Sequence, residues 1–217
     1  MSTSSQADSK ANLSQSTGSF AELVAEGTPT PGGGSVSAYC GVLAASLGQM
    51  VCAITIGKPK YAAVEPRLNE IASQLERTSS RLRELIAEDA ASFEAVLSAY
   101  RLPKDTEEQK SERTSEIQKA LQYAIAVPFE TAERSLEVLK LLGELAEIGT
   151  PNALSDVAVG SQLAQVAVKG ASYNVSANLG SISDSTAAQK TRENMNSIIE
   201  QSKTIAEKVD EKMKTQS

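Results

Sequence analysis

Residues 29–35 read Pro-Thr-Pro-Gly-Gly-Gly-Ser and lead straight into an apolar segment, which makes them the first candidate for a ligand site. The two prolines suppress helix before the turn, and the three glycines let another molecule approach the main chain closely. Ser35 is a candidate N-cap of the helix that follows. Unpaired N–H groups at a helix N-terminus suit a carboxylate or a phosphate. Taken alone, the stretch also fits an ordinary tight turn between two elements.

Two aspartates are candidate acid–base groups. Apolar side chains recur at helical spacings over residues 68–100, and Asp89 continues their stripe, four residues after Leu85 and four before Phe93. A carboxylate on a packing face is costly unless it is hydrogen-bonded, paired or used, so this position fits a buried polar contact and a functional group equally. Asp156 falls in the first turn of a later predicted helix, where the helix dipole favours it. A role in starting that helix is the alternative to catalysis for Asp156.

The composition narrows the chemistry that these groups can carry out. The chain contains no histidine, the commonest proton shuttle and transition-metal ligand, so acid–base work falls to Asp, Glu, Lys, Tyr or Cys. A formal net charge of −6 argues against nucleic acid or an anionic membrane as the main partner. An anionic ligand needs a local basic patch, and Lys58 and Lys60 beside Tyr61 supply one. Lysines that cap the C-terminus of a helix are the alternative interpretation.

The N-terminal quarter of the chain is expected to contain a tail, a short turn and an apolar helix. Residues 1–18 are rich in Ser, Gln and Thr, which predicts a disordered tail and not a signal peptide, so the cytoplasm is the default location. Residues 20–24 read as a short helical turn. The apolar segment 36–56 is long enough for a membrane span, but its serines and glycines favour a central helix buried by others. Cys40 and Cys52 lie about 18 Å apart along it and read as buried hydrophobic side chains.

Five further helices are predicted after the apolar segment. Two of them are expected at residues 66–100 and 128–148. A helix capped by Asp105 or Thr106 lies between these two, and Pro128 breaks or kinks it. The last two are a helix capped by Ser155 and a helix over residues 187–212 that Asp184 or Ser185 starts. No segment carries a β-hairpin signal. The sequence therefore predicts an all-α, up-and-down bundle of about five to six long helices, in a single domain over residues 19–217.

One face of the helix after Ser155 carries small residues between polar ends. Its members, at spacings of three and four, are Asp156, Gly160, Leu163, Ala167, Gly170, Asn174 and Asn178. Small residues let a neighbouring helix come close, so we expect this face in the interface of a two-fold dimer. Asp156 and Asn178 are separated by about 33 Å of helix and cannot share a site within one subunit. An antiparallel two-fold partner brings them together.

Four motifs in this order resemble a family of tetrahydrofolate enzymes, the cyclodeaminase/cyclohydrolase family, over nearly the whole chain. They are residues 29–35, the stretch 55–58 (Thr-Ile-Gly-Lys) with Tyr61, residues 88–93 (Glu-Asp-Ala-Ala-Ser-Phe), and residues 151–156 (Pro-Asn-Ala-Leu-Ser-Asp) followed by Asn174 and Asn178. The family comprises the C-terminal formiminotetrahydrofolate cyclodeaminase domain and free-standing methenyltetrahydrofolate cyclohydrolases.

The resemblance implies an all-helical homodimer that opens or closes the one-carbon bridge between N5 and N10 of tetrahydrofolate. Both reactions need proton transfer at a tetrahedral carbon, and neither needs a metal or a cofactor beyond the folate substrate. By resemblance, Asp156 is the first candidate for the acid–base group and Asp89 the second. The glycine turn and Lys58 would face the pterin or the glutamate tail. The residues expected to bind substrate are Pro31, Gly32, Gly33, Gly34, Ser35, Lys58, Tyr61, Ser155, Asn174 and Asn178.

Within this family we favour the cyclohydrolase, which adds water to the methenyl bridge to give 10-formyltetrahydrofolate. The sequence carries no formiminotransferase domain, so nothing in it hands over the formimino substrate of the cyclodeaminase. The cyclodeaminase, which expels ammonia to close the bridge, remains the alternative. A third interpretation is a helical dimer that binds folate without catalysis, because Asp89, Asp156 and the glycine turn each have a structural role as well.

Overall fold

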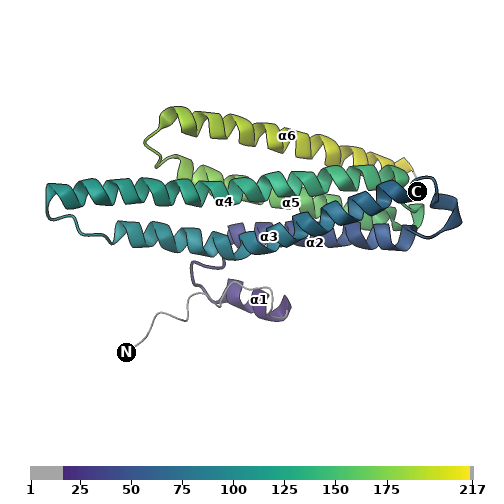
Figure 1. Cartoon of the computed structure of the whole chain (residues 1–217), viewed down its shortest axis with the longest axis horizontal. Coiled ribbons are helices and arrows are strands. Elements are labelled where there is room, and N and C mark those ends of the chain that lie inside the picture. Colours follow the sequence, from purple (N-terminus) through teal and green to yellow (C-terminus); the bar gives the residue numbers. More distant parts are fainter. Residues whose placement is uncertain (1–16, 216–217) are drawn as a thin grey trace.

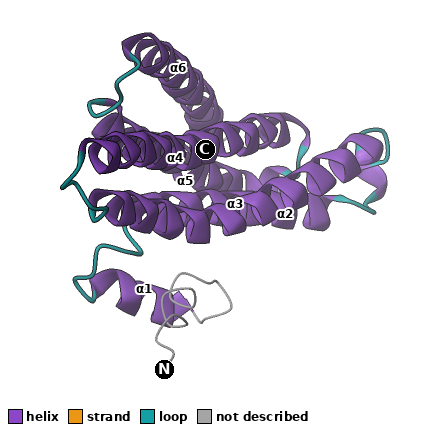
Figure 2. Ribbon diagram, turned by 60° about the vertical axis from the view of Figure 1, so that its left-hand side comes forward, coloured by secondary structure: helices purple, strands orange, loops and turns teal. Residues whose placement is uncertain are grey.

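Six α-helices and no strand make up residues 17–215, the part of the chain that this computed structural model describes (Figure 1, Figure 2). The helices are α1 (Thr17–Ala25), α2 (Gly33–Thr55), α3 (Glu65–Tyr100), α4 (Glu107–Ile148), α5 (Leu154–Leu179) and α6 (Ser185–Thr215). Short 3₁₀ turns at Pro59–Tyr61 and Pro151–Ala153 precede α3 and α5. The all-α prediction is confirmed. Of the predicted tail, residues 1–16 lie outside the described residues, and Thr17 and Gly18 begin α1.

The long helices run up and down, beginning with α2 (Figure 1). It packs against α3, α4 and α5, while α1 stands apart from the bundle and reaches it through the ring of Phe20, 5.2 Å from that of Tyr39. By length and composition α2 is apolar enough to cross a membrane, yet half of its most apolar window is buried inside the protein. Its packing therefore supports the interpretation as a central helix of the bundle.

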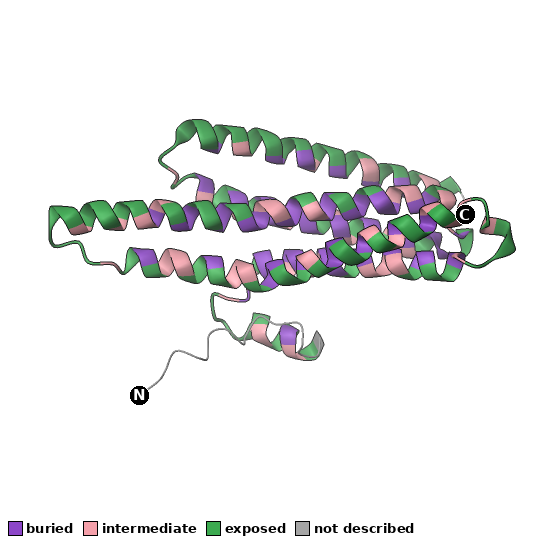
Figure 3. Ribbon diagram, in the orientation of Figure 1, coloured by how far each residue is buried: buried purple, intermediate pink, exposed green. Residues whose placement is uncertain are grey.

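The inner stripe of α3 forms the core together with α2 and α4, and Figure 3 shows the buried residues along the facing sides of these helices. Leu82 and Leu85 are fully buried, as their spacing predicts. The stripe changes at Asp89, because α2 begins opposite that residue and the rest of α3 packs mainly on α4. Phe93 and Tyr100, which continue the stripe, are accordingly 38% and 48% exposed.

The helix α4 continues through Pro128, so the predicted break at this residue is wrong. Proline has no N–H for the carbonyl four residues earlier, which here belongs to Ala124. The carboxamide of Asn178, on α5, supplies a donor in its place, with Nδ2 3.3 Å from the Ala124 oxygen. A side chain of a neighbouring helix thus satisfies the group that the proline leaves open.

Replacing Asn178 with alanine is expected to lower the free energy of unfolding by about 1–3 kcal/mol, because the buried Ala124 carbonyl loses its donor. Pro128→Ala restores a main-chain N–H to that carbonyl, so Asn178→Ala should cost clearly less in the Pro128→Ala background. Urea unfolding of the four proteins of this double-mutant cycle measures the coupling. Equal costs in both backgrounds would show that Asn178 stabilises the fold in another way.

Two of the four predicted helix caps are correct. Thr106 caps α4 with its side chain, and the Asp184 carboxylate accepts a hydrogen bond in the first turn of α6. Ser35 is not a cap, because α2 begins two residues earlier and places Ser35 in its third position. Ser155 is likewise inside α5, whose N-cap is Ala153. The hydroxyl of Ser35 is therefore free to bond outside its own helix.

The small-residue face of α5 packs inside the chain, so its predicted place in a dimer interface is wrong. A Cβ atom on Gly160 would lie 3.3 Å from Leu142 of α4, and one on Gly170 would overlap the hydroxyl of Ser37 in α2. Ala167, between them, is fully buried. The small residues serve the close approach of α5 to α2 and α4 of the same subunit.

Candidate functional site

A pocket of about 250 Å³ lies where the N-terminus of α2 meets α3 and α5. Three groups of predicted site residues that are far apart in the sequence meet in this pocket: the glycine turn, Asp89, and the pair of asparagines on α5. Pro31, in the same turn, is buried and does not line it. The lining residues are Pro29, Thr30, Gly32, Gly33, Gly34, Asp89, Ser92, Phe93, Val96, Ala124, Asn174 and Asn178.

Asp89 is held against the first turn of α2. Its Oδ2 atom accepts a hydrogen bond from the Ser35 hydroxyl at 2.9 Å. Gly34 makes this approach possible, since a Cβ atom there would overlap Oδ1 and lie 2.6 Å from Cγ of Asp89. Burial raises the pKa of Asp89, and hydrogen bonds from the hydroxyl and the main chain of Ser35 lower it in part. A carboxyl with a raised pKa exchanges its proton nearer to neutral pH than an exposed aspartate does.

Gly34→Ala is expected to displace the Asp89 carboxyl and to lower the free energy of unfolding by about 1–3 kcal/mol through overpacking. Gly33→Ala is the matched control, because its Cβ atom would meet Asn174 Nδ2 only at 3.8 Å. Alanine is also the better helix former, by about 1 kcal/mol. Thermal unfolding distinguishes the two variants. Equal stability of the two variants would show that the Asp89 carboxyl does not pack against Gly34.

The two asparagines form the polar wall of the pocket on the α5 side. Asn174 donates through Nδ2 to the carbonyl of Gly170, and Asn178 donates through Nδ2 to the carbonyls of Asn174 and Ala124. Each carboxamide is oriented by these bonds and keeps Oδ1 as the acceptor that it offers a ligand. Among residues 17–215, no three Asp, Glu or Cys side chains gather closely enough to hold a metal ion.

The other predicted site residues, Lys58, Tyr61, Ser155 and Asp156, lie at the opposite end of the bundle. The 23 residues of α2, about 34 Å of helix, separate Lys58 from the glycine turn. A hydrogen bond from the Thr150 N–H to the Thr55 hydroxyl joins the C-terminus of α2 to the segment before α5. The prediction that Lys58 and the glycine turn form one anion-facing surface is therefore wrong within a single chain.

Six of the residues that line the pocket are absent from the predicted set of site residues. Pro29 and Thr30 belong to the turn that the sequence singled out, whereas the other four come from α3 and α4. Ser92, Phe93 and Val96 follow Asp89 by three, four and seven positions. Helical spacing places all three on the same face as Asp89, and that was the available signal. Ala124, on α4, carries no signal of its own.

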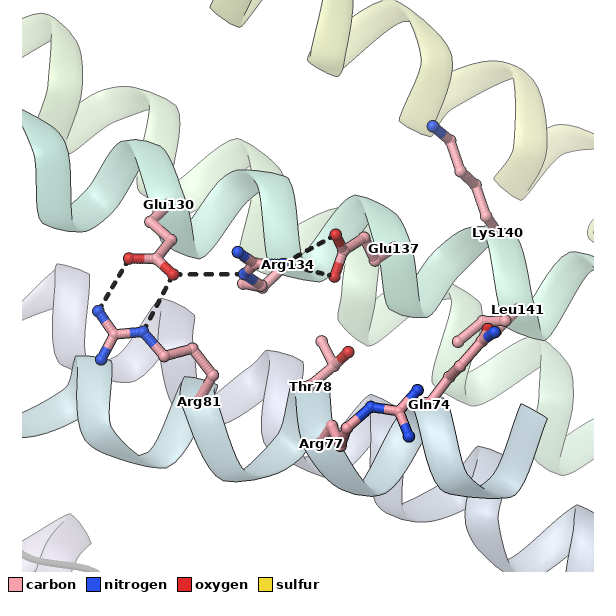
Figure 4. A pocket seen from close by; sticks show the side chains of 9 residues that line it. All are labelled: Gln74, Arg77, Thr78, Arg81, Glu130, Arg134, Glu137, Lys140 and Leu141. Carbon is pink, nitrogen blue, oxygen red and sulfur yellow. Dashed lines mark hydrogen bonds and ion pairs between the residues drawn. The ribbon is translucent and has the colours of Figure 1, made fainter. Parts of the chain in front are cut away.

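A larger hollow between α3 and α4, of about 610 Å³, is lined by four basic side chains and two glutamates. Among these, Arg81 and Arg134 bind Glu130, and Arg134 also binds Glu137 (Figure 4). Arg81 gives all five of its guanidinium donors to Glu84, Glu88 and Glu130. These bonds raise the pKa of Arg81 and lower that of Glu130. The bonds from Arg81 to Glu130 thus join α3 to α4.

Comparison with known proteins agrees with the motifs. The family model for formiminotransferase-cyclodeaminase matches residues 16–197. The chain is 35% identical to a methenyltetrahydrofolate cyclohydrolase of Methylorubrum extorquens, over 90% of this chain and 94% of that protein. It is 34% identical to the formimidoyltransferase-cyclodeaminase of Rattus norvegicus, over 89% of this chain and 36% of that larger protein.

The fold is also similar to a solved one. The crystal structure of a formiminotetrahydrofolate cyclodeaminase from Thermotoga maritima superposes with a TM-score of 0.80 and 31% identity, over 93% of this chain and 96% of that chain. The family match spans the glycine turn, both aspartates and both asparagines. The resemblance that the four motifs predict is therefore confirmed, and the chain belongs to the formiminotransferase-cyclodeaminase family.

Proposed function

We propose that this chain is a methenyltetrahydrofolate cyclohydrolase, which hydrolyses the 5,10-methenyl bridge to give 10-formyltetrahydrofolate. The observation that carries the proposal is the 35% identity to a cyclohydrolase of which the chain covers 94%. The cyclodeaminase is the second candidate, supported by the solved structure at 31% identity and 96% coverage. Since both relatives match over nearly their full length, the extent of the chain does not separate the two activities.

The Asp89 pocket suits the hydrolysis chemically. The methenyl bridge carries a delocalised positive charge, and Asp89 is the only charged side chain that residues 17–215 contribute to the pocket lining. Water attacks the bridge carbon and gives up a proton to that carboxylate as the carbon–oxygen bond forms. The proton then passes to N5 as the N5–carbon bond breaks, which leaves the formyl group on N10. The second proton of the water is released to solvent.

The geometry favours Asp89 for this proton transfer, whereas the motifs alone put Asp156 first. Asp89 is half-buried, lines a pocket and accepts a hydrogen bond from Ser35 in the first turn of α2. Asp156 is half-buried in the first turn of α5, at the far end of the same subunit. We assign proton transfer to Asp89 and a second role, in a site shared between subunits, to Asp156.

A homodimer would bring the Asp156 end of one subunit to the Asp89 pocket of the other. An exposed apolar face supports such a dimer. This face is formed by α2 and α5, which pack side by side. Its exposed residues are Leu43, Met50 and Ile54 on α2, and Val159, Val166 and Tyr173 on α5. An apolar face of this extent on two adjacent helices is typical of a protein interface. A two-fold axis in this face, at right angles to the helices, sets the Lys58 and Asp156 end of one subunit against the Asp89 pocket of the other.

The activity is tested by the loss of the near-ultraviolet absorbance of methenyltetrahydrofolate, read against an enzyme-free blank. Acceleration by the purified protein, without ammonia release from 5-formiminotetrahydrofolate, is the expected result. Ammonia release without acceleration would replace the cyclohydrolase with the cyclodeaminase. Folate binding with neither reaction would favour a protein that binds folate without catalysis.

A further inference from the structure

The Ser35 hydroxyl lies between two acceptors on α3. Its Oγ atom is 2.9 Å from Asp89 Oδ2 and 3.1 Å from the main-chain oxygen of Ile86, and the residue is fully buried. A hydroxyl has one proton to donate, so Ser35 serves one of these acceptors at a time. The arrangement therefore has two states that differ only in the rotation of one O–H bond.

This orientation is unusual within α2. The hydroxyls of Ser37, Ser46 and Thr55 donate to the carbonyl four residues earlier in the same helix. Such back-bonding is the ordinary behaviour of Ser and Thr in a helix. Ser35 instead bonds across to α3, because its place in the first turn of α2 lies directly opposite Asp89.

The two rotations match the two protonation states of Asp89. When Asp89 is ionised, the Ser35 proton points to Oδ2. When Oδ2 is protonated, the carboxyl donates to Oγ and the Ser35 proton turns to the Ile86 carbonyl. In both states each buried polar atom of the trio keeps a partner, which avoids the cost of an unsatisfied group.

We propose that Ser35 is the positioning residue that lets Asp89 take up and release a proton without moving. The inference rests on the proposed function, since it gives Asp89 the acid–base role. No other titratable side chain lines the pocket from the turn, α2, α4 or α5. The neighbouring Glu88 is bound to Arg81 in the network between α3 and α4. Ser35 is thus the group that responds to the charge of Asp89.

The test is the titration of the Asp89 carboxyl in Ser35→Ala. Infrared difference spectra against Asp89→Asn isolate the carboxyl band of Asp89 and need no turnover. Loss of the hydroxyl removes a donor to the ionised form, so the titration should move up by about one to two pH units. The acidic limb of the kcat–pH profile should move by the same amount, with KM little changed.

Two further variants separate positioning from a structural role. Ser37→Ala removes a hydroxyl that back-bonds within α2, and it should leave the titration of Asp89 in place. Ser35→Cys keeps a weak donor and should give an intermediate shift. An unchanged titration in Ser35→Ala, with only a lower melting temperature, would overturn the proposal. Because the infrared titration uses no folate, this outcome is distinct from a failure of the wild-type protein to hydrolyse methenyltetrahydrofolate.

Discussion

Asp89→Asn is expected to lower kcat by a factor on the order of 10²–10⁴ while the helical fold survives, as for the loss of a general acid–base group. Among the described residues of one chain, no other titratable side chain lines the pocket, so the same subunit offers no substitute for the proton transfer. Asparagine has the shape of aspartate and can still accept the hydrogen bond from Ser35. Steady-state kinetics with methenyltetrahydrofolate and circular dichroism measure the two properties.

The stability of this variant distinguishes catalysis from a structural role. Burial raises the pKa of Asp89 in the folded state above its unfolded value, so its contribution to stability falls as the pH rises through that range. Asp89→Asn removes the buried charge, and the free energy of unfolding at neutral pH should therefore stay the same or rise. If the Asp89 carboxylate had only a structural role, Asp89→Asn would clearly lower the free energy of unfolding.

The pH profile of the wild-type protein follows from the same shift. Proton transfer from water needs the ionised carboxylate, so kcat should fall as the pH drops through the pKa of Asp89. Because burial raises this pKa, the acidic limb lies at a higher pH than an exposed aspartate would give. Glu94→Gln, at an exposed carboxylate on the same helix, is the control and should keep normal turnover. A loss in kcat of less than tenfold in Asp89→Asn would contradict the assigned role.

The sequence predicted the helices well, because each carries its own periodicity and end signals. The α3 stripe, Thr106 and Asp184 are examples in which the local pattern is sufficient. The break at Pro128 was wrong because its cost is met by Asn178, a residue 50 positions later. The pattern of residues around Pro128 does not indicate that another helix supplies this hydrogen-bond donor.

The candidate site was predicted in part for the same reason. Asp89 was found because it interrupts an apolar stripe, and the glycine turn because of its composition. Gly34 has no side chain, and this leaves room for Asp89 only because α2 pairs with α3. No local sequence pattern predicts that pairing. The small face of α5 shows the converse, since small residues allow close packing but do not say whether the partner is Ser37 of the same chain or a second subunit.

The proposed shared site makes a quantitative prediction for mixed dimers. A dimer of Asp89→Asn chains, or of Asp156→Asn chains, has two impaired sites. A heterodimer of one chain of each kind has one site with both changes and one site with neither. After subunit exchange by joint refolding, random pairing makes half of the dimers heterodimers, so activity should recover to about a quarter of the wild-type value. No recovery would show that both groups act from the same chain.

A second mixture controls for this arithmetic. Wild-type chains are combined with chains that carry both Asp89→Asn and Asp156→Asn, at equal concentration. If the site is shared, both sites of the heterodimer are impaired and only wild-type homodimers work, which leaves about a quarter of the activity. If each site belongs to one chain, the heterodimer keeps one intact site and the activity is about a half. The two mixtures together thus distinguish a site built across α2 and α5 of two subunits from a pocket that is complete within one.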